Sequence, residues 1–171
     1  LSEIPDYAFC YSLVTVEKFS SNLKSIGKWS LIWATVADAL PETLEKIGPY
    51  AFYVCDLPET FAIPSSVTSV GDGAFGSTAG VKEITIGSGP ASISSGLFDG
   101  SSVEKIIIDN SADDVTGAEN LPSTGVEIVY LVESINDAVG DTISNAAGSK
   151  TLQEAVNEAP DGVETTINIQ K

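Results

Sequence analysis

The sequence contains no arginine, no histidine and no methionine among its 171 residues. Without histidine, it has no Ser/His or Cys/His nucleophile pair, no imidazole metal ligand and no proton shuttle near neutral pH. Without arginine, no side chain can clamp a phosphate or a carboxylate in a bidentate manner. Only carboxylate, lysine and tyrosine chemistry remains, so these absences disfavour an enzyme, and nothing in the sequence indicates a cofactor.

Positive charge is also scarce, because eight lysines stand against 24 acidic residues and the formal net charge is −16. This balance disfavours nucleic acid and anionic membrane surfaces as partners. No apolar run is long enough to cross a bilayer and no signal peptide is recognisable, so we expect no membrane insertion. The chain begins with leucine rather than methionine, which suggests a mature or excised fragment.

What the sequence has in abundance is repetition. A hydrophobic anchor recurs every 21–23 residues, and a second anchor follows it by five residues. The first anchors are Ile4, Ile26, Ile47, Val70, Ile93 and, in a weaker copy, Val115. The second anchors are Phe9, Leu31, Phe52, Phe75 and Phe98, and the sixth unit has Asn120 in that place. A unit of this length cannot close a core alone, so the period predicts stacked units that share one core.

A short strand-like phrase separates each second anchor from the next first anchor. It reads VKEITI at 81–86, VEKIII at 103–108 and VEIVYL at 126–131. Positions one, four and six of the phrase are predicted to face the core, and positions three and five to face outward. The alternative is an ordinary all-β domain with regularly spaced strands.

The two cysteines, Cys10 and Cys55, lie two units apart. In a stack of strands this is about two strand spacings, roughly 10 Å, which is too far for a disulfide. We therefore predict that both are buried thiols that pack as small apolar residues.

The segment LEKIGPYAFYVCDLPETFAIPSSV at 44–67 follows the pattern L-x-x-I-G-x-x-A-F-x-x-C-x-x-L-x-x-I-x-I-P-x-x-V, with one extra residue before Ile63. In this it resembles the leucine-rich repeat of BspA-like bacterial surface proteins. The segments 67–75 and 81–86 are also close to the pattern, the second unit has Leu31 in place of Phe, and the sixth unit is degenerate. The resemblance spans about residues 1–131.

This resemblance implies the fold class: an α+β, mostly β solenoid, built as a leucine-rich repeat stack of about five or six units with a C-terminal helix-strand tail. It also implies a secreted or surface-attached bacterial protein, and some proteins of this family adhere to host matrix proteins or to other bacteria. Fold alone does not fix function, least of all in a repeat scaffold.

The period ends at residue 132, so we predict a leucine-rich repeat domain at 1–131 and a second part at 132–171. Residues 134–145 fit a helix or a helix followed by a strand, and 148–150 fit a loop. Thr151 and Glu154 form a capping box that begins a helix over 151–159, and 163–170 are predicted to be a strand. The phrase KTLQEAVNEAPDGVETTINI is also similar to the opening segment of parallel β-helix modules such as pectate lyases. The tail is therefore a cap for the stack or the start of a second, β-helix-like module.

The outward strand positions form the surface most open to a partner. In register, the candidate binding residues are Glu83, Thr85, Lys105, Ile107, Ile128 and Tyr130. The three apolar ones are expected to be neighbours on one sheet face, where such a cluster can mark a binding site. The opposing hypothesis, which we favour, is that the helix at 151–159 covers them.

Aromatic residues in loops form a second candidate surface, composed of Tyr11, Trp29, Trp33, Tyr50 and Tyr53. Such rings suit stacking on sugars or contact with a protein. Their spacing also fits packing between layers, which is the interpretation we favour.

Acidic residues gather near the sixth unit, at Asp109, Asp113, Asp114 and Glu119. Their oxygens suit Ca²⁺, but no Asp-x-Asp-x-Asp-Gly loop is present. A solvated acidic loop is therefore favoured, and no metal site is assigned.

Together these features predict a non-catalytic extracellular recognition or adhesion module, secreted or at the cell surface. It would bind host or bacterial surface proteins or glycans across the sheet face, as a monomer and without a cofactor. One alternative is a structural spacer or scaffold in a multi-module surface protein. Another is the N-terminal fragment of a carbohydrate-active β-helix protein.

Overall fold

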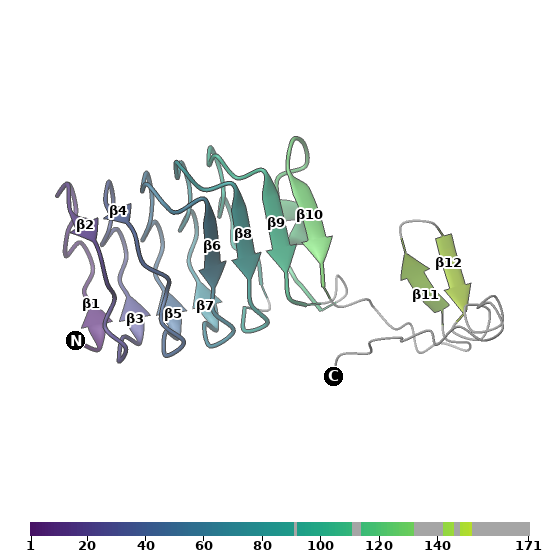
Figure 1. Cartoon of the computed structure of the whole chain (residues 1–171), viewed down its shortest axis with the longest axis horizontal. Helices are drawn as coiled ribbons and strands as arrows, with labels where there is room; N and C mark the ends of the chain where they lie inside the picture. Colours follow the sequence, from purple (N-terminus) through teal and green to yellow (C-terminus); the bar gives the residue numbers. More distant parts are fainter. Residues whose placement is uncertain (91, 111–113, 132–141, 146–147, 152–171) are drawn as a thin grey trace.

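The computed structural model describes residues 1–90, 92–110, 114–131, 142–145 and 148–151. The described residues between 1 and 131 wind into a parallel β-solenoid of about six coils (Figure 1). Each coil is numbered from its first anchor. The strands are β1 (Glu3–Ile4), β2 (Thr15–Val16), β3 (Ser25–Ile26), β4 (Thr35–Val36), β5 (Lys46–Ile47), β6 (Thr60–Ile63), β7 (Ser69–Val70), β8 (Glu83–Ile86), β9 (Lys105–Ile108), β10 (Glu127–Tyr130), β11 (Thr142–Asn145) and β12 (Gly148–Thr151). The described residues also include one 3-10 helix, η1 (Ala118–Asn120). The predicted leucine-rich repeat stack is confirmed.

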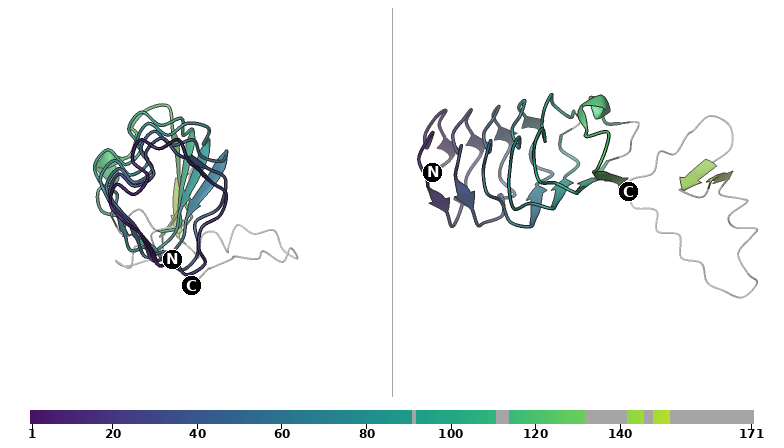
Figure 2. Two further views of the ribbon diagram at one scale, coloured as in Figure 1. Left: turned by 90° about the vertical axis from the view of Figure 1, so that its left-hand side faces the viewer. Right: turned by 90° about the horizontal axis from the view of Figure 1, so that it is seen from above.

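Parallel sheets run along the solenoid axis on different sides of the coils, as the end-on view in Figure 2 shows. One sheet has the order β1-β3-β5-β7 and pairs Ile4 with Ile26, Ile26 with Ile47, and Ile47 with Val70. These are the first anchors, so the predicted register is correct for the first four coils. A second sheet has the order β6-β8-β9-β10, and β2 pairs with β4 in a third.

The second anchors form the centre of the core. Phe52 and Phe75 are fully buried, and their rings stack with centroids 5.0 Å apart and planes 6° apart. Phe98 continues the column at 6.2 Å from Phe75. Phe9, which has a neighbouring coil on one side only, is 39% exposed. The burial of an anchor therefore depends on having a coil on both sides, as expected of a solenoid.

Three first anchors are followed by a glycine, which is required there by the close approach of successive coils. A Cβ on Gly27 would lie 2.5 Å from the backbone nitrogen of Asp6, and one on Gly48 would lie 2.6 Å from that of Lys28. A Cβ on Gly71 would likewise collide with Pro49. Glycine therefore occupies this place in the second, third and fourth coils because a Cβ would collide with the preceding coil there.

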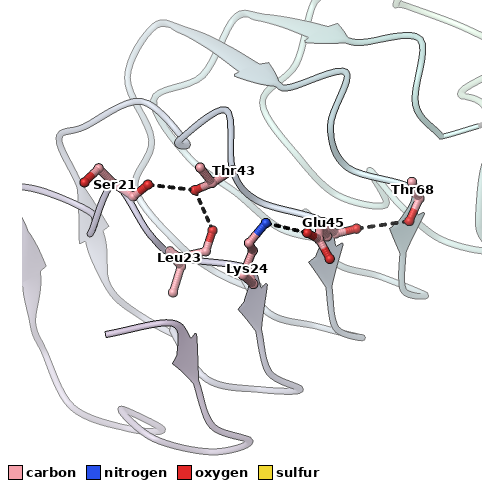
Figure 3. Close-up of polar contacts among 6 residues, drawn as sticks. All are labelled: Ser21, Leu23, Lys24, Thr43, Glu45 and Thr68. Atoms are coloured by element: carbon pink, nitrogen blue, oxygen red, sulfur yellow. Dashed lines mark hydrogen bonds and ion pairs between the residues drawn. The ribbon is translucent and has the colours of Figure 1, made fainter.

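Polar side chains link neighbouring coils at the corner that leads into β3, β5 and β7. Figure 3 shows these links among Ser21, Leu23, Lys24, Thr43, Glu45 and Thr68. Thr43 Oγ1 donates to the carbonyl oxygens of Ser21 at 3.0 Å and Leu23 at 2.8 Å. Lys24 Nζ donates to Glu45 Oε1 at 2.6 Å, and this hydrogen bond and charge hold the pKa of Glu45 below its ordinary value. The corner thus satisfies main-chain carbonyls that the sheets do not reach.

The cysteines are both free, as predicted, but only one is buried. Cys55 is fully buried, and its thiol donates to the carbonyl oxygen of Leu31 at 2.8 Å. Burial raises the pKa of Cys55 to about 12. Cys10 is half-buried, because it lies in the first coil and has a neighbouring coil on one side only.

The sixth unit departs from the predicted spacing. A bridge joins Ser92 to Thr116, a step of 24 residues rather than the 22 predicted from Ile93 to Val115. Asn120, which replaces the second anchor, lies at the end of η1 and donates through Nδ2 to the carbonyl oxygen of Ile93 at 2.9 Å. The amide thus makes a polar link between coils where earlier coils have a buried apolar side chain.

Within the tail, the structure describes two antiparallel strands. β11 pairs with β12, with Thr142 opposite Thr151. The prediction of a loop at 148–150 is therefore wrong, because these residues belong to β12. The predicted helix over 151–159, apart from Thr151 itself, and the predicted strand over 163–170 lie outside the described residues, as does the question of whether that helix covers the sheet. Across the described part of the chain, no helix is long and apolar enough to cross a membrane.

Candidate interaction surfaces

The outward face of the β6-β8-β9-β10 sheet carries two columns of side chains. The strands are paired in register, so equivalent residues follow one another along the axis. The first column contains Thr60, Glu83, Lys105 and Glu127, and the second contains Ala62, Thr85, Ile107 and Val129. The alternate residues of β6, β8 and β9 are buried in the core. The structure therefore places Glu83, Thr85, Lys105 and Ile107 on the outward face, as predicted.

Ile128 and Tyr130 do not lie on that face, so this part of the prediction is wrong. In the pairing of β9 with β10, Ile128 is opposite Ile106 and Tyr130 is opposite Ile108. Both partners are buried, and Ile128 and Tyr130 pack against the core as half-buried residues. A shift of one residue in a strand exchanges its two faces, and here it brings Val129 next to Ile107.

The two columns differ in chemistry. In the first, Lys105 Nζ lies 3.7 Å from Glu83 Oε2, and Glu127 is opposite Lys105 on the other side. In the second, small or β-branched side chains form a smooth, partly exposed strip. An apolar strip beside a charged column has the composition of an interface centre with a polar rim.

A corner of each coil has a backbone feature that the sequence did not reveal. Two positions, four residues apart and on either side of the second anchor, have positive φ in each of the first five coils. The first row of these positions contains Tyr7, Trp29, Tyr50, Gly73 and Gly96. The second row contains Tyr11, Trp33, Val54, Ser77 and Gly100.

Left-handed backbone is normally a place for glycine, because a Cβ costs about 1–2 kcal/mol there. The fifth coil follows that rule in both rows, whereas the first three coils carry mostly tyrosine and tryptophan. Tyr7 was not among the aromatic candidates. The sequence nevertheless showed an aromatic residue or a glycine at this fixed place in each of the first five coils. The rings must therefore be explained by packing or by function.

Packing explains one group, composed of Trp29, Tyr50 and Tyr53. The rings of Trp29 and Tyr50 stack with centroids 4.3 Å apart and planes 14° apart. Tyr53 meets both edge to face, at 5.6 and 5.7 Å. The Tyr50 ring lies over Gly73 of the next coil, and the Tyr53 ring lies over Gly76. These three rings are half-buried and fill the corner between coils.

Packing does not explain a second group in the other row. Tyr11 and Trp33 meet edge to face, with centroids 5.3 Å apart and planes 75° apart. Their side chains are 69% and 46% exposed. Trp33 lies between Tyr11 and Val54 in its row, so its exposure is not a consequence of standing at the end of the stack. We call Tyr11 and Trp33 the exposed ring pair.

An open groove of about 530 Å³ lies where the fifth coil meets the irregular sixth unit. Its lining includes two carboxylates, Asp99 and Glu119, both exposed, together with hydroxyl side chains and glycines. No group of three or more acidic or cysteine residues in the described part of the chain is placed to hold a metal ion, and Asp113 of the acidic group lies outside that part. The groove presents hydrogen-bonding groups but no nucleophile paired with a base.

Comparison with known proteins places these features in a family. The model of the BspA type leucine-rich repeat region matches residues 2–118 in six copies. A crystal structure of a leucine-rich repeat protein from Bacteroides ovatus is similar in fold, with a TM-score of 0.54 and 19% sequence identity. The similarity covers 76% of this chain and 49% of that one, so the chain spans about half the length of that protein. No curated protein sequence matches significantly. Because six repeat copies cover most of the solenoid, the chain belongs to the BspA-type leucine-rich repeat family.

Proposed function

We propose that this chain is a non-catalytic recognition module of a secreted or cell-surface bacterial protein, and that it binds another protein through the outward face of β6, β8, β9 and β10. Leucine-rich repeat proteins serve as interaction or scaffold modules and are generally non-enzymatic, which supports the class of function. The choice of surface rests on one observation. The second outward column, Ala62, Thr85, Ile107 and Val129, is a row of small and β-branched side chains, three of them apolar, beside a charged column.

Such a strip suits a protein partner because flat, regularly spaced apolar side chains can be desolvated together while the neighbouring charges remain at the rim. The net charge of −16 favours a partner whose matching surface is basic. Long-range attraction would then raise the rate of association and make it dependent on salt.

The test is a binding screen against purified extracellular-matrix proteins, comparing the native chain with the double variant Ile107→Asp, Val129→Asp. Both residues are half-exposed, so the substitutions place two charges in the centre of the strip with little disturbance of the core. Thr35→Asp, on the exposed side of β4, is a matched control that adds a charge elsewhere on the solenoid. Loss of binding in the double variant alone supports the proposal, and equal binding by all three proteins contradicts the choice of surface.

A spacer or scaffold is the second candidate, and one observation favours it. Several exposed charges already have partners in an adjacent coil: Lys24 with Glu45, Lys82 with Glu104, and Lys105 with Glu83. Charges paired along the axis serve the stack itself rather than a partner. A screen in which no matrix protein binds at low salt, with the fold intact by circular dichroism, would favour this function.

A further inference from the structure

The exposed ring pair lies at a corner of the first and second coils, whereas the strip proposed to bind protein lies on β6, β8, β9 and β10. Tyr11 and Trp33 take left-handed backbone with φ of 58° and 66°, the conformation that Gly100 adopts at the equivalent place in the fifth coil. Glycine adopts this backbone conformation with less strain than tyrosine or tryptophan, and the fifth coil has glycine there. Non-glycine residues in left-handed backbone cluster at active sites and ligand clamps.

The two rings are also held in a defined arrangement. Each is fixed at its base by the corner backbone, and the edge of one faces the other at a centroid distance of 5.3 Å. Rings that are already ordered lose little further freedom when a ligand stacks on them. Their polar atoms, the Tyr11 hydroxyl and the Trp33 indole N–H, can in addition hydrogen-bond to the ligand.

The charge of the chain narrows the class of ligand. A net charge of −16 repels anionic polymers such as nucleic acids and acidic polysaccharides. Flat aromatic faces combined with a few hydrogen-bonding groups suit a ligand that has an apolar face and a polar edge. A pyranose ring whose hydroxyl groups are all equatorial has such a face, because its axial C–H bonds point to either side of the ring.

The angle between the two ring planes narrows the class of ligand further. Planes that differ by 75° cannot both lie flat against one crystalline surface. They suit a single soluble chain that can lay one sugar on one ring and turn the next toward the other. We propose that Tyr11 and Trp33 form a stacking site for a neutral, β-linked oligosaccharide of glucose or N-acetylglucosamine.

The test is isothermal titration of the 171-residue chain with cellohexaose, laminarihexaose and hexa-N-acetylchitohexaose, and with an acidic oligogalacturonide for comparison. We expect saturable binding of at least one of the three neutral hexasaccharides and none of the acidic one. Removing a stacked ring weakens binding of a planar ligand substantially, so Tyr11→Gly and Trp33→Gly should each raise Kd about tenfold or more. Trp33→Phe keeps a ring and should retain part of the affinity.

Glycine is the informative replacement because it separates binding from folding. At a φ of 58° or 66° it relieves the backbone strain, which offsets part of the packing lost with the ring, so both glycine variants should keep the circular dichroism spectrum and the cooperative melting transition of the native chain. Val54→Gly is the matched control: its φ is 57°, it belongs to the same row and it removes no ring. It should leave Kd unchanged.

Three results would overturn the proposal. One is the absence of binding to all three neutral hexasaccharides, and another is undiminished binding by both glycine variants. The third is that Trp33→Gly loses a protein partner found in the matrix screen while no hexasaccharide binds, which would assign the rings to the protein interface. The variant Ile107→Asp, Val129→Asp should still bind the sugar, so that failure of the sheet-face proposal and failure of this one remain distinguishable.

Discussion

Replacing Phe75 with alanine tests whether the second anchors form one shared column. Phe75 is fully buried, stacks on Phe52 at 5.0 Å, and has Phe98 and Phe61 at 6.2 and 6.1 Å. Its ring therefore contacts the coils on both sides and a β6 side chain across the core. Removing the ring leaves a cavity that these neighbours cannot fill without moving other coils.

The cost follows from those contacts. A Phe→Ala change in a well-packed core costs about 3–5 kcal/mol, and ring pairs contribute about 0.5–1.5 kcal/mol beyond the buried area. Phe75 has three ring partners, so Phe75→Ala should lower the free energy of unfolding by about 4–5 kcal/mol, the upper end of this range. Phe9→Ala is the matched control, because Phe9 occupies the same place in the first coil but is 39% exposed. Since no closed cavity forms there, about 1–2 kcal/mol is expected.

The assay is equilibrium unfolding in urea, followed in parallel by circular dichroism and by tryptophan fluorescence. Both tryptophans, Trp29 and Trp33, lie in the second coil, so fluorescence reports the N-terminal coils while circular dichroism reports the whole stack. In a stack held by neighbour contacts, a weak central coil can divide the cooperative unit. We expect the two probes to separate in Phe75→Ala and to coincide in Phe9→Ala.

Equal losses of unfolding free energy in the two variants would contradict a shared column of second anchors. Such a column would also be refuted if Phe75→Ala cost less than about 1 kcal/mol, since a side chain that contributes so little is not the centre of a core. If circular dichroism and fluorescence gave coincident transitions for Phe75→Ala together with a large loss of stability, the shared column would still be supported. The coils would then be shown to unfold as one unit.

Three further outcomes can be measured on the same chain. Ser30 is fully buried at a place where two later coils have alanine, and its hydroxyl group has no hydrogen-bond partner in the described part of the chain. Ser30→Ala should therefore raise the free energy of unfolding in urea by about 1 kcal/mol. Gly48→Ala would bring a Cβ to 2.6 Å from Lys28 N, so it should lower the melting temperature, and an unchanged temperature would contradict the close approach of the coils. Burial raises the pKa of Cys55 from 9.0 to about 12. The stability that this thiol contributes is therefore fully present below pH 9 and should be lost as the pH rises toward 12. In unfolding measured at pH 8 and pH 11, Cys55→Ala should lose less stability between the two pH values than the native chain does.

The sequence predicts the fold well because the anchors obey two independent constraints. A residue such as Phe52 must be apolar to be buried, and it must recur at the coil length to meet Phe75 in the next coil. The glycine at position 48 adds a third constraint, set by the distance between coils. Constraints that repeat can be found by comparing the chain with itself, which is why the register of the first four coils was correct.

The register of β10 was mispredicted for a physical reason. Its phrase, VEIVYL, has four consecutive apolar residues from Ile128 to Leu131, so alternation does not tell which face is buried. The choice is made by hydrogen bonding with β9, which sets Glu127 opposite Lys105. This places Ile128 and Tyr130 against the core and leaves Leu131 57% exposed. A last strand with a partner on one side only has the weakest local constraint on its register.

The left-handed backbone at the corners could not be predicted from the sequence, because residue type predicts the backbone angles only on average. Tyr50 and Trp33 are both aromatic residues with positive φ, and both bear the same strain. The Tyr50 ring stacks on Trp29 and covers Gly73, so the packing between coils offsets that strain. The Trp33 ring meets Tyr11 edge to face but remains 46% exposed, so packing offsets less of that strain. Two aromatic residues with the same backbone conformation, in different rows of the corner, are therefore separated by what their rings touch, which is why Trp33 rather than Tyr50 is assigned to the proposed sugar site.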